Sequence, residues 1–354
     1  MTARAVDVLC VGLGPAGACA AAAAAARGLR VLAVDRKRVA GEPVQCAEFV
    51  PALIGSEVPA LADAVRQRID AMDTFVETQA ADHTAPFPGH MLDRAAFDAG
   101  LVAAARRAGV ECRFATRVSA VGRDGEVTLS EGERVAPRLL VGADGPRSLV
   151  GRAVGRVNRA LVETRQVTVP LLAPHAATDI FLSASIRGGY GWLFPKGDLA
   201  NVGAGVEPGM SHALKEIVAS LHERLAREGR VGRAVRRTTG GPIPVGGPLD
   251  PVARLGKVPV LLAGDAAGLA NPVTGAGIAA AVQSGTLAGE AAARFLEGRA
   301  EALDDYETEL EALFGPALRR ALARRQELLR SRPTAAALRR AWIAYPEYWT
   351  REQR

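Results

Sequence analysis

The chain alternates between short apolar runs and segments rich in glycine, proline and charged residues. The first apolar run covers 6–11, an alanine-rich stretch follows at 18–26, and a second apolar run ends at Val34. A short apolar run bounded by turn residues is typical of a buried strand, whereas the longer alanine-rich stretch favours a helix. The opening segment 5–36 therefore predicts a strand–helix–strand unit.

The following segments predict one helix and several short strands. A loop rich in glycine and proline extends to Pro51, and residues 93–108 place apolar side chains at helical spacing. Asp93 opens this segment and is a suitable N-cap. Strands are predicted at 111–114, 118–121, 127–129 and 138–141.

From about residue 162 to 245 the pattern changes to segments in which apolar and polar residues alternate. Such alternation is typical of an antiparallel sheet with two different faces. The segments lie at 165–170, 178–182, 192–194 and 200–206, and one helix near 214–228 interrupts them. A buried strand at 259–263, a long helix from Gly275 toward Leu296 and mostly helical residues at 303–354 complete the predicted elements.

Three glycines, Gly12, Gly14 and Gly17, separate the first predicted strand from the body of the first predicted helix. Gly12 allows a tight turn, Gly14 lets the backbone approach a phosphate, and Gly17 lets the helix pack close to the sheet. Pro15 and Ala16 fall at the helix N-terminus, where free N–H groups and a partial positive charge attract an anion. This order predicts a site for the pyrophosphate of a dinucleotide, with a tight turn that binds nothing as the alternative.

The second predicted strand ends in an acidic residue, Asp35. A carboxylate at this place accepts hydrogen bonds from a ribose 2′-OH. Arg36 and Lys37 follow and would suit a 2′-phosphate, but Asp35 would repel one. The segment therefore predicts a dinucleotide without that phosphate, of which FAD is the better fit.

Two further glycine–aspartate motifs follow predicted buried strands. The first, at 142–148, contains Asp144, and the second, at 264–268, contains Gly264 and Asp265. Ligands of open α/β sheets bind at the carboxyl ends of the strands, which is where both acids stand. A turn with Asp and Gly needs no function, but three such signals in order along one chain strengthen the prediction of a nucleotide site.

These elements predict an α/β protein in which a discontinuous Rossmann-type nucleotide-binding domain carries an inserted antiparallel β-sheet domain and C-terminal helices. The nucleotide-binding domain is assigned to 1–72, 90–160 and 255–302. The sheet domain, expected to bind the substrate, is assigned to 73–89 and 161–254, and a C-terminal helical cap to 303–354.

Composition narrows the range of partners. The 354 residues are 49% hydrophobic and 23% charged, and the net charge of +6 comes almost entirely from arginine. Because basic residues are not interleaved with aromatic ones, we expect no nucleic-acid partner. The four cysteines and five histidines lack metal-ligand spacing, so no metal is expected. Cys10, Cys19 and Cys112 fall in predicted elements and are expected to be inert core residues.

The N-terminal residues carry no signal-peptide pattern and lead straight into the first strand. The apolar stretch 18–26 is shorter than the roughly 20 residues that span a bilayer. A cytoplasmic location is therefore expected. Nothing in the pattern predicts a large assembly, so we expect a monomer or a weak homo-oligomer.

The three glycine-containing motifs resemble those of FAD-dependent oxidoreductases with the p-hydroxybenzoate hydroxylase fold. The resemblance implies FAD as cofactor, with Asp265 on its ribityl and ribose hydroxyls and contacts from Arg94 and Val118. Residues 272–278 resemble the flavin-contacting turn of that family, which implies contacts from Pro272, Gly275, Ala276, Gly277 and Ile278. A helix that begins there would aim backbone N–H groups at the flavin N1–C2=O edge.

A narrower resemblance, which spans most of the chain, is to the geranylgeranyl reductases. Residues 189–198, with Asn201-Val202-Gly203 behind them, are similar to the central signature of that family. Strand periodicity places Tyr190, Trp192 and Phe194 on one face. The resemblance implies that this face lines a cavity in front of the flavin; the alternative is that the three rings fill the core.

Residues 43–48 resemble the Cys-Gly-Glu loop of the same family, with Ala47 in place of the usual glycine. The resemblance implies that Cys46 lies near the isoalloxazine ring, where it would tune hydride transfer or supply a proton. An ordinary loop thiol is the alternative, because reactivity requires exposure and a depressed pKa, which a sequence does not show.

The resemblance implies an FAD-dependent reductase that saturates C=C bonds of a prenyl or other apolar substrate by hydride transfer from reduced flavin. NAD(P)H or ferredoxin would supply the electrons. Two alternatives are an FAD-dependent monooxygenase that uses NAD(P)H and O₂, and a non-catalytic prenyl-binding escort protein. The first shares the same cofactor motifs, whereas the second has no need of them.

The C-terminal region is rich in arginine at mixed helical spacing. With neighbouring leucines these side chains would hold the protein peripherally on an anionic membrane surface, but a solvated helix face is the commoner arrangement and is preferred here. The arginines are Arg319, Arg320, Arg324, Arg325, Arg330, Arg332, Arg339 and Arg340.

Overall fold

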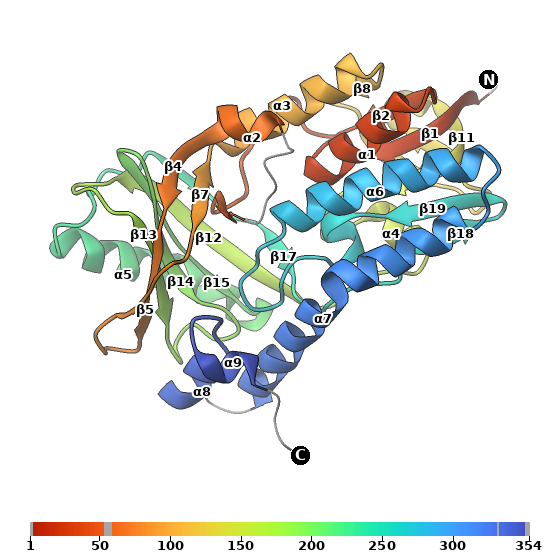
Figure 1. Cartoon of the computed structure of the whole chain (residues 1–354). Helices are drawn as coiled ribbons and strands as arrows, with labels where there is room; N and C mark the ends of the chain where they lie inside the picture. Colours follow the sequence, from red (N-terminus) through yellow and green to blue (C-terminus); the bar gives the residue numbers. More distant parts are fainter. Residues whose placement is uncertain (1–2, 53–58, 331–332, 351–354) are drawn as a thin grey trace.

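The computed structural model describes residues 3–52, 59–330 and 333–350. Within these residues two large sheets lie at opposite ends of the molecule, and a small sheet and a long helix connect them (Figure 1). The first sheet is mainly parallel and the second mainly antiparallel, as the two hydrophobic patterns predict. The chain is therefore an α/β protein with a separate sheet built from its middle segment.

The first sheet has the strand order β18-β19-β11-β1-β2-β8, and β10 and β9 extend it from β11. Its four central pairings are parallel, because helical crossovers return the chain to the same edge of the sheet. Its strands are β1 (Arg4–Val11), β2 (Val31–Val34), β8 (Glu111–Arg113), β9 (Val118–Val121), β10 (Val127–Leu129), β11 (Arg134–Gly142), β18 (Val252–Leu255) and β19 (Val258–Leu262).

Three helices pack together beside this sheet: α1 (Pro15–Ala26), α3 (Arg94–Arg107) and α6 (Ile278–Leu296). The contact between α1 and α6 is close because α1 carries mostly alanine and α6 presents two glycines. A Cβ at Gly285 would lie 2.2 Å from the Ala16 carbonyl oxygen, and one at Gly289 2.2 Å from that of Ala20. The alanine-rich helix predicted from the sequence is α1, and its small side chains let α6 pack closely against it. Asp93 caps α3, as predicted, by accepting a hydrogen bond from Ala96 N.

The second sheet has the order β16-β12-β15-β14-β13-β5-β6, and β17 pairs with β12. The helix α5 (Leu214–Arg227) covers one of its faces with Leu214, Val218, Leu221 and Leu225. Its strands are β5 (Ala71–Val76), β6 (Asp82–Thr84), β12 (Leu161–Pro170), β13 (Ala177–Leu182), β14 (Gly191–Lys196), β15 (Leu199–Val206), β16 (Arg237–Thr239) and β17 (Pro242–Pro244).

One pairing departs from the predicted antiparallel sheet, because β5 and β13 run parallel. β5 comes from a part of the chain far before β13, so no hairpin constrains its direction. The predicted domain boundaries at 72 and 254 fall inside β5 and β18, each of which belongs to a single sheet. The division of the chain into domains stays a prediction.

A three-stranded sheet, β3-β7-β4, lies beside the second large sheet, where β4 and β7 contact β14. Its first strand occupies the end of the segment that was predicted to be a loop up to Pro51. Its elements and the short helices nearby are β3 (Phe49–Pro51), α2 (Pro59–Ala64), β4 (Val65–Ile69), β7 (Gly89–Leu92) and α4 (Leu149–Ala153).

The C-terminal helix α7 (Ala302–Arg330) runs from the first sheet toward the second, where α8 (Ala335–Arg340) and α9 (Pro346–Trp349) follow (Figure 1). Tyr306 anchors its start by donating a hydrogen bond from its hydroxyl to Leu262 O, 2.7 Å away. None of the helices in the described ranges combines the length and apolarity needed to cross a bilayer.

The predicted solvated face of C-terminal arginines is wrong for two of them. Arg324 is 5% exposed and donates hydrogen bonds to the carbonyl oxygens of Glu347, Tyr348 and Thr350. Arg325 is 8% exposed and donates to Gly188 O at 2.5 Å. Arg324 satisfies carbonyls at the end of the short helix α9, and Arg325 satisfies one in the loop before β14, which helical spacing alone cannot reveal. Arg332 lies outside the described residues.

Candidate active site

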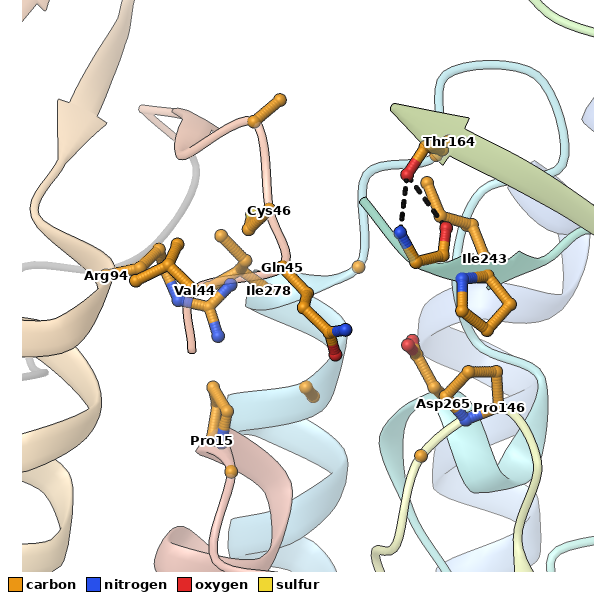
Figure 2. Close-up of a pocket in the computed structure, with 18 of the residues that line it drawn as sticks. Pro15, Val44, Gln45, Cys46, Arg94, Pro146, Thr164, Ile243, Asp265 and Ile278 are labelled. Carbon is orange, nitrogen blue, oxygen red and sulfur yellow. Dashed lines mark hydrogen bonds between the residues drawn. The ribbon is translucent and has the colours of Figure 1, made fainter. Parts of the chain in front are cut away.

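A cavity of about 690 Å³ lies where the carboxyl ends of the first sheet meet one face of the second sheet. Its lining includes residues that follow β1, β2, β11 and β19, together with side chains from β12, β13 and β14. Figure 2 shows Pro15 and Arg94 on one side of this space and Pro146 and Asp265 on the other. The predicted motifs therefore meet at one place.

The glycine turn fits a pyrophosphate for two different reasons. Gly12 has φ +101°, and a Cβ there would lie 2.2 Å from the Ala143 carbonyl oxygen. Gly14 lines the cavity, yet a Cβ there would meet no protein atom within 4 Å. The empty space beside Gly14, at the N-terminus of α1, is where a phosphate would lie. Pro15 and Ala16 also line the cavity, whereas Gly17 serves packing, since its Cβ would lie 1.8 Å from Gly12 O.

Asp35 is fixed at the edge of the same cavity. Its carboxylate oxygens accept hydrogen bonds from Leu13 N and Lys37 N, both at 2.8 Å. These bonds orient the carboxylate and leave lone pairs for a ribose hydroxyl. Arg36 and Val118 line the cavity near it. Contacts of all three residues with a nucleotide stay predictions.

Asp144 and Asp265, the acids of the two other glycine–aspartate motifs, differ in their hydrogen-bond partners. Asp144 accepts hydrogen bonds from Ser148 Oγ, Leu149 N and Val150 N, so much of its carboxylate is used to fix the start of α4. Asp265 receives no side-chain or backbone hydrogen bond on its carboxylate from the residues that the structure describes. Burial raises the pKa of Asp265 to about 6, and Arg94 partly opposes this shift. A partly buried acid without a donor among the described residues fits the ribityl hydroxyls that the resemblance implies.

The turn at 272–278 contributes backbone to the cavity. Gly275, Ala276, Gly277 and Ile278 line it, and Asn271 Oδ1 holds the turn by accepting from Val273 N and Thr274 N. The helix α6 begins at Ile278, three residues after the predicted start, because Gly275 has φ +70°. Neither Pro272 nor Gly264 lines the cavity. Pro272 borders a small adjoining pocket, and Gly264 N donates to Ser284 Oγ.

Side chains of the second sheet hold the Cys46 loop (residues 44–48) in the cavity. Three successive interactions involve its backbone: Thr239 Oγ1 donates to Val44 O at 2.5 Å, Gln166 Nε2 to Cys46 O at 2.9 Å and Asn201 Nδ2 to Ala47 O at 3.2 Å. Cys46 Sγ accepts a hydrogen bond from Glu48 N at 3.2 Å. The loop conformation is thus defined although Ala47 replaces a glycine. The role of Cys46 stays a prediction.

Glu48 is a site residue that the sequence reasoning missed. Its side chain is 1% exposed, and its backbone has φ +72°, which is unfavourable for a non-glycine residue. The carboxylate accepts hydrogen bonds from Lys196 Nζ at 2.9 and 3.0 Å and from Asn201 Nδ2 at 3.0 Å. Lys196 and Asn201 belong to the predicted signature around Trp192, and Glu48 ends the loop segment 43–48. These polar residues in two predicted motifs were the sequence signal that could have revealed the interaction.

Arg94 stands in the first turn of α3 with its guanidinium group in the cavity wall. It donates to both carboxylate oxygens of Asp98, at 3.1 and 3.2 Å. Burial would lower the pKa of Arg94, but Asp98 and Cys46 hold that pKa above its usual value. A permanent positive charge therefore lies beside Cys46 and faces Asp265 across the cavity (Figure 2). Its predicted contact with FAD stays a prediction.

The aromatic face of β14 forms one end of the cavity, which we call the chamber; its wall includes Thr178, Tyr190, Trp192, Phe194 and Trp342. The rings of Tyr190, Trp192 and Phe194 line the chamber together, as the period-two spacing predicts. The Trp192 and Phe194 ring centroids are 6.1 Å apart, and those of Tyr190 and Trp342 are 4.8 Å apart. Tyr190 donates its hydroxyl hydrogen bond to Thr274 O at 2.6 Å. The rings therefore pack on one another while bordering open space.

One group outside the cavity has residue types that bind metals: Asp73, His175 and Asp179. His175 Nε2 lies 2.7 Å from Asp179 Oδ1, and Arg230 forms an ion pair with the other oxygen of Asp179. Because an arginine already neutralises the buried carboxylate, we assign no metal to this group.

Three family models match successive parts of the chain. The FAD dependent oxidoreductase model matches residues 7–138, the geranylgeranyl reductase catalytic domain model matches 163–241, and the FAD binding domain model matches 252–321. The middle match includes most of β12 and all of β13 to β15, which contribute the aromatic face. The outer two include the glycine turn, Asp35 and Asp265, whereas the segment with Asp144 lies between the matches.

Curated relatives align along most of the chain. A digeranylgeranylglycerophospholipid reductase of Methanothrix thermoacetophila is 35% identical over 81% of this chain and 77% of its own length. Digeranylgeranylglycerophospholipid reductase 2 of Methanopyrus kandleri is 34% identical, with 89% of this chain and 85% of that protein covered. Digeranylgeranylglycerophospholipid reductase 3 of Methanosphaera stadtmanae is 30% identical, with 94% and 89% covered.

Solved structures show the same fold. A geranylgeranyl bacteriochlorophyll reductase-like protein of Thermoplasma acidophilum matches with a TM-score of 0.85 at 24% identity, covering 95% of this chain and 90% of that one. A probable FAD-dependent monooxygenase of Pseudomonas aeruginosa matches with a TM-score of 0.70 at 22% identity, covering 95% and 98%. The p-hydroxybenzoate hydroxylase-like fold predicted from the motifs is thereby confirmed.

The relatives that are at least 30% identical decide between the classes that share this fold. Each is covered over more than two thirds of its length, and the nucleotide motifs that a flavoenzyme needs are intact in this chain. The chain is an FAD-dependent oxidoreductase and belongs to the geranylgeranyl reductase family.

Proposed function

We propose that this protein reduces C=C bonds in the prenyl chains of a lipid of the digeranylgeranylglycerophospholipid class. The observation that carries the proposal is the single cavity, in which the glycine turn and Asp265 form one end and the aromatic chamber the other. FAD bound at the first end would supply the hydride. The names of the curated relatives support the substrate class.

The chamber suits an alkene because its wall is largely apolar. Met72, Ile180 and Phe194 border it together with the rings of Tyr190 and Trp192. An unactivated alkene resists hydride, so the reacting carbon must be held close to the donor atom and water kept away. Rigid rings that pack on one another provide a fixed wall at little conformational cost.

Cys46 is the candidate proton donor. Reduction of an alkene adds a hydride to one carbon and a proton to the other, and the thiol would supply that proton from Sγ. The hydrogen bonds from Gln166 and Asn201 to the loop backbone would fix where this sulfur points. A buried water is the alternative source of the proton. If Cys46 is the donor, the pH dependence of kcat should change in C46S, and if water is the donor, it should not.

We also propose that NAD(P)H or ferredoxin reduces the cofactor. A peripheral position on the cytoplasmic face of a membrane would give the protein access to the lipid. The exposed arginines of α7 and α8, such as Arg319 and Arg340, would support the membrane contact.

A mass measurement tests the proposed reaction. The FAD-loaded protein, reduced with dithionite without oxygen, is incubated with a digeranylgeranylglycerol phospholipid and with geranylgeraniol. We expect the substrate to gain two mass units for each double bond reduced. No gain with any of several prenyl lipids would overturn the proposal. Oxygen consumption stimulated by substrate, with one oxygen atom in the product, would indicate a monooxygenase instead.

A further inference from the structure

Arg325 is a buried cation of α7 that the proposed function does not use. The residue is 8% exposed, and its guanidinium group donates to Gly188 O at 2.5 Å and to Pro272 O at 3.4 Å. Both acceptors are neutral carbonyl groups. Among the residues that the structure describes, no carboxylate forms an ion pair with Arg325, and the one that acts on it from a distance, Glu207, is paired with Arg187 at 2.7 Å.

The guanidinium group of Arg325 keeps its charge in these surroundings. Burial lowers the pKa of Arg325 to about 10, and Glu207 partly opposes this shift. The group is therefore protonated at neutral pH. A buried charge that lacks a counter-charge is costly, so its presence in a folded protein requires an explanation.

Arg325 contacts the back of the turn at 272–278, the front of which lines the cavity. Gly275 N donates to Asn271 O at 2.9 Å and closes this turn, so that Pro272 lies within a single turn of chain from Gly275. Arg325 and Pro272 also border the small adjoining pocket, of about 30 Å³. The residues that this pocket shares with the cavity are Thr164, Tyr190, Trp192, Ile243, Thr274 and Gly275.

Two donors hold carbonyl groups of this turn, and only one of them is charged. The hydroxyl of Tyr190 donates to Thr274 O at 2.6 Å, and burial raises the pKa of Tyr190, so this donor is neutral. Arg325 donates to Pro272 O. A neutral side chain is thus sufficient to hold the turn. The positive charge of Arg325 therefore indicates an electrostatic role in addition to the hydrogen bond.

We propose that Arg325 raises the reduction potential of FAD bound in the cavity by placing a positive charge behind the turn at 272–278. On reduction, two electrons and one proton enter the flavin and leave a negative charge at the N1–C2=O edge, which this turn is predicted to face. At a separation of about 10 Å and an effective dielectric constant of about 20, a positive charge favours the reduced form by about tenfold.

The inference goes beyond the proposed function, because it concerns the cofactor and holds whatever the substrate is. The electrons come from the reductant that an FAD-dependent oxidoreductase requires. Arg325 is not a catalytic residue, since it acts across the turn and does not line the cavity. Its charge would make the bound flavin easier to reduce.

Arg324, the preceding residue of α7, offers a matched control. It is 5% exposed and also donates to carbonyl oxygens, but these belong to the C-terminal residues 347–350, and it pairs with Glu327 at 3.1 Å. R324M and R325M each remove a buried guanidinium group and leave carbonyl groups without their donor. Both variants should therefore have a lower melting temperature. Only R325M removes a charge from behind the turn.

The test measures the midpoint potential of the FAD-loaded protein, without substrate, by reductive titration against a reference dye near pH 7.5. We expect R325M to lower the potential by about 30 mV, which is a tenfold change in the equilibrium constant of a two-electron couple. R325K retains the charge and should stay closer to the parent than to R325M, and R324M should match the parent. E207Q removes the carboxylate that partly offsets Arg325, so its potential should rise.

Equal potentials in R325M and the parent would overturn the proposal. A fall in R325K or R324M as large as that in R325M would also overturn it, because lost packing and not lost charge would then be the cause. If R325M does not fold or binds no flavin, E207Q decides, and a potential that does not rise would overturn the proposal. Failure of the proposed function is separate, because an absence of prenyl reduction in the mass measurement leaves these potentials as they are.

Discussion

The two ends of the cavity are built by different means. At the end predicted to hold the cofactor, the cavity is lined by backbone, by a glycine without a side chain and by the carboxylates of Asp35 and Asp265, each placed at the end of a strand of the first sheet. In the chamber, the contacts are alternate side chains of the second sheet, with Trp342 added from the C-terminal region. The first end is local in sequence, and the second is assembled from distant segments.

This difference separates cofactor binding from substrate recognition. The cofactor end has the rigidity of the strand-to-helix turns and serves any chemistry that the flavin supports, which agrees with the shared fold of reductases and monooxygenases. Changes at the first end should therefore abolish flavin binding, and changes in the chamber should leave flavin in place while they alter the substrate or the stability of the second sheet.

The largest effect is expected from the glycine turn. G12A forces a side chain into the Ala143 carbonyl at a positive φ, so we expect the protein to misfold or to purify without flavin. G14A is the informative partner, because its methyl group meets no protein atom and occupies only the phosphate space. We expect G14A to keep the parent melting temperature as apoprotein while its FAD affinity falls by about 100-fold, measured by quenching of FAD fluorescence. Unchanged FAD affinity in G14A would contradict the assignment of this space.

The next largest effect is expected from the ion pair between Lys196 on β14 and Glu48 in the Cys46 loop. K196M removes the nearer of two cations that pair with the buried Glu48 carboxylate, and Arg237, 3.7 Å away, remains. Removing one partner of a buried ion pair costs about 3–5 kcal/mol of unfolding free energy, so with Arg237 in place we expect a loss of up to about 3 kcal/mol. Urea unfolding followed by circular dichroism measures this loss. The exposed Lys215 on α5 is the control, and K215M should have little effect.

A companion variant distinguishes charge from packing at the same place. The double variant E48Q/K196M should recover part of the lost stability, because it no longer buries a carboxylate that has lost its nearest cation. In the FAD-loaded enzyme, both variants should keep the flavin and lower kcat, since the loop that carries Cys46 loses its anchor. If either variant loses its flavin as well as the anchored conformation of the Cys46 loop, the two ends of the cavity do not act independently.

The smallest effect is a pH dependence at the cofactor end. Burial raises the pKa of Asp265 to about 6 in the free protein, above its ordinary value, so the acid is mostly protonated at pH 5 and ionised at pH 7.5. The ionised carboxylate accepts hydrogen bonds from ribityl hydroxyls, and a bound FAD would therefore lower this pKa. By linkage, FAD affinity of the apoprotein should rise about tenfold from pH 5 to pH 7.5.

The matching control is D265N, which should bind FAD more weakly and without this rise. The stability of the apoprotein should change in the opposite direction. A folded-state pKa above the unfolded value means that the contribution of Asp265 to stability is greatest below pH 4 and is lost as pH rises through about 6. An identical pH profile for the parent and D265N would rule out Asp265 as the titrating group.

The sequence by itself determined the cofactor end of the molecule. Gly12, Gly14 and Gly17 and the acids Asp35 and Asp265 are informative because a strand, a turn and a helix start are set by a few adjacent residues. The period-two spacing of Tyr190, Trp192 and Phe194 likewise fixed one face of a strand. These features follow from local backbone geometry, so they are readable without knowledge of distant contacts.

Only the tertiary structure decided the rest. The parallel pairing of β5, the burial of Arg324 and Arg325 and the ion pair of Glu48 with Lys196 all depend on segments more than a helix apart in the chain. The position of Arg325 behind the turn at 272–278 becomes visible only once α7 is packed against that turn. Such features arise from long-range packing and hydrogen bonding, whose partners no local pattern specifies.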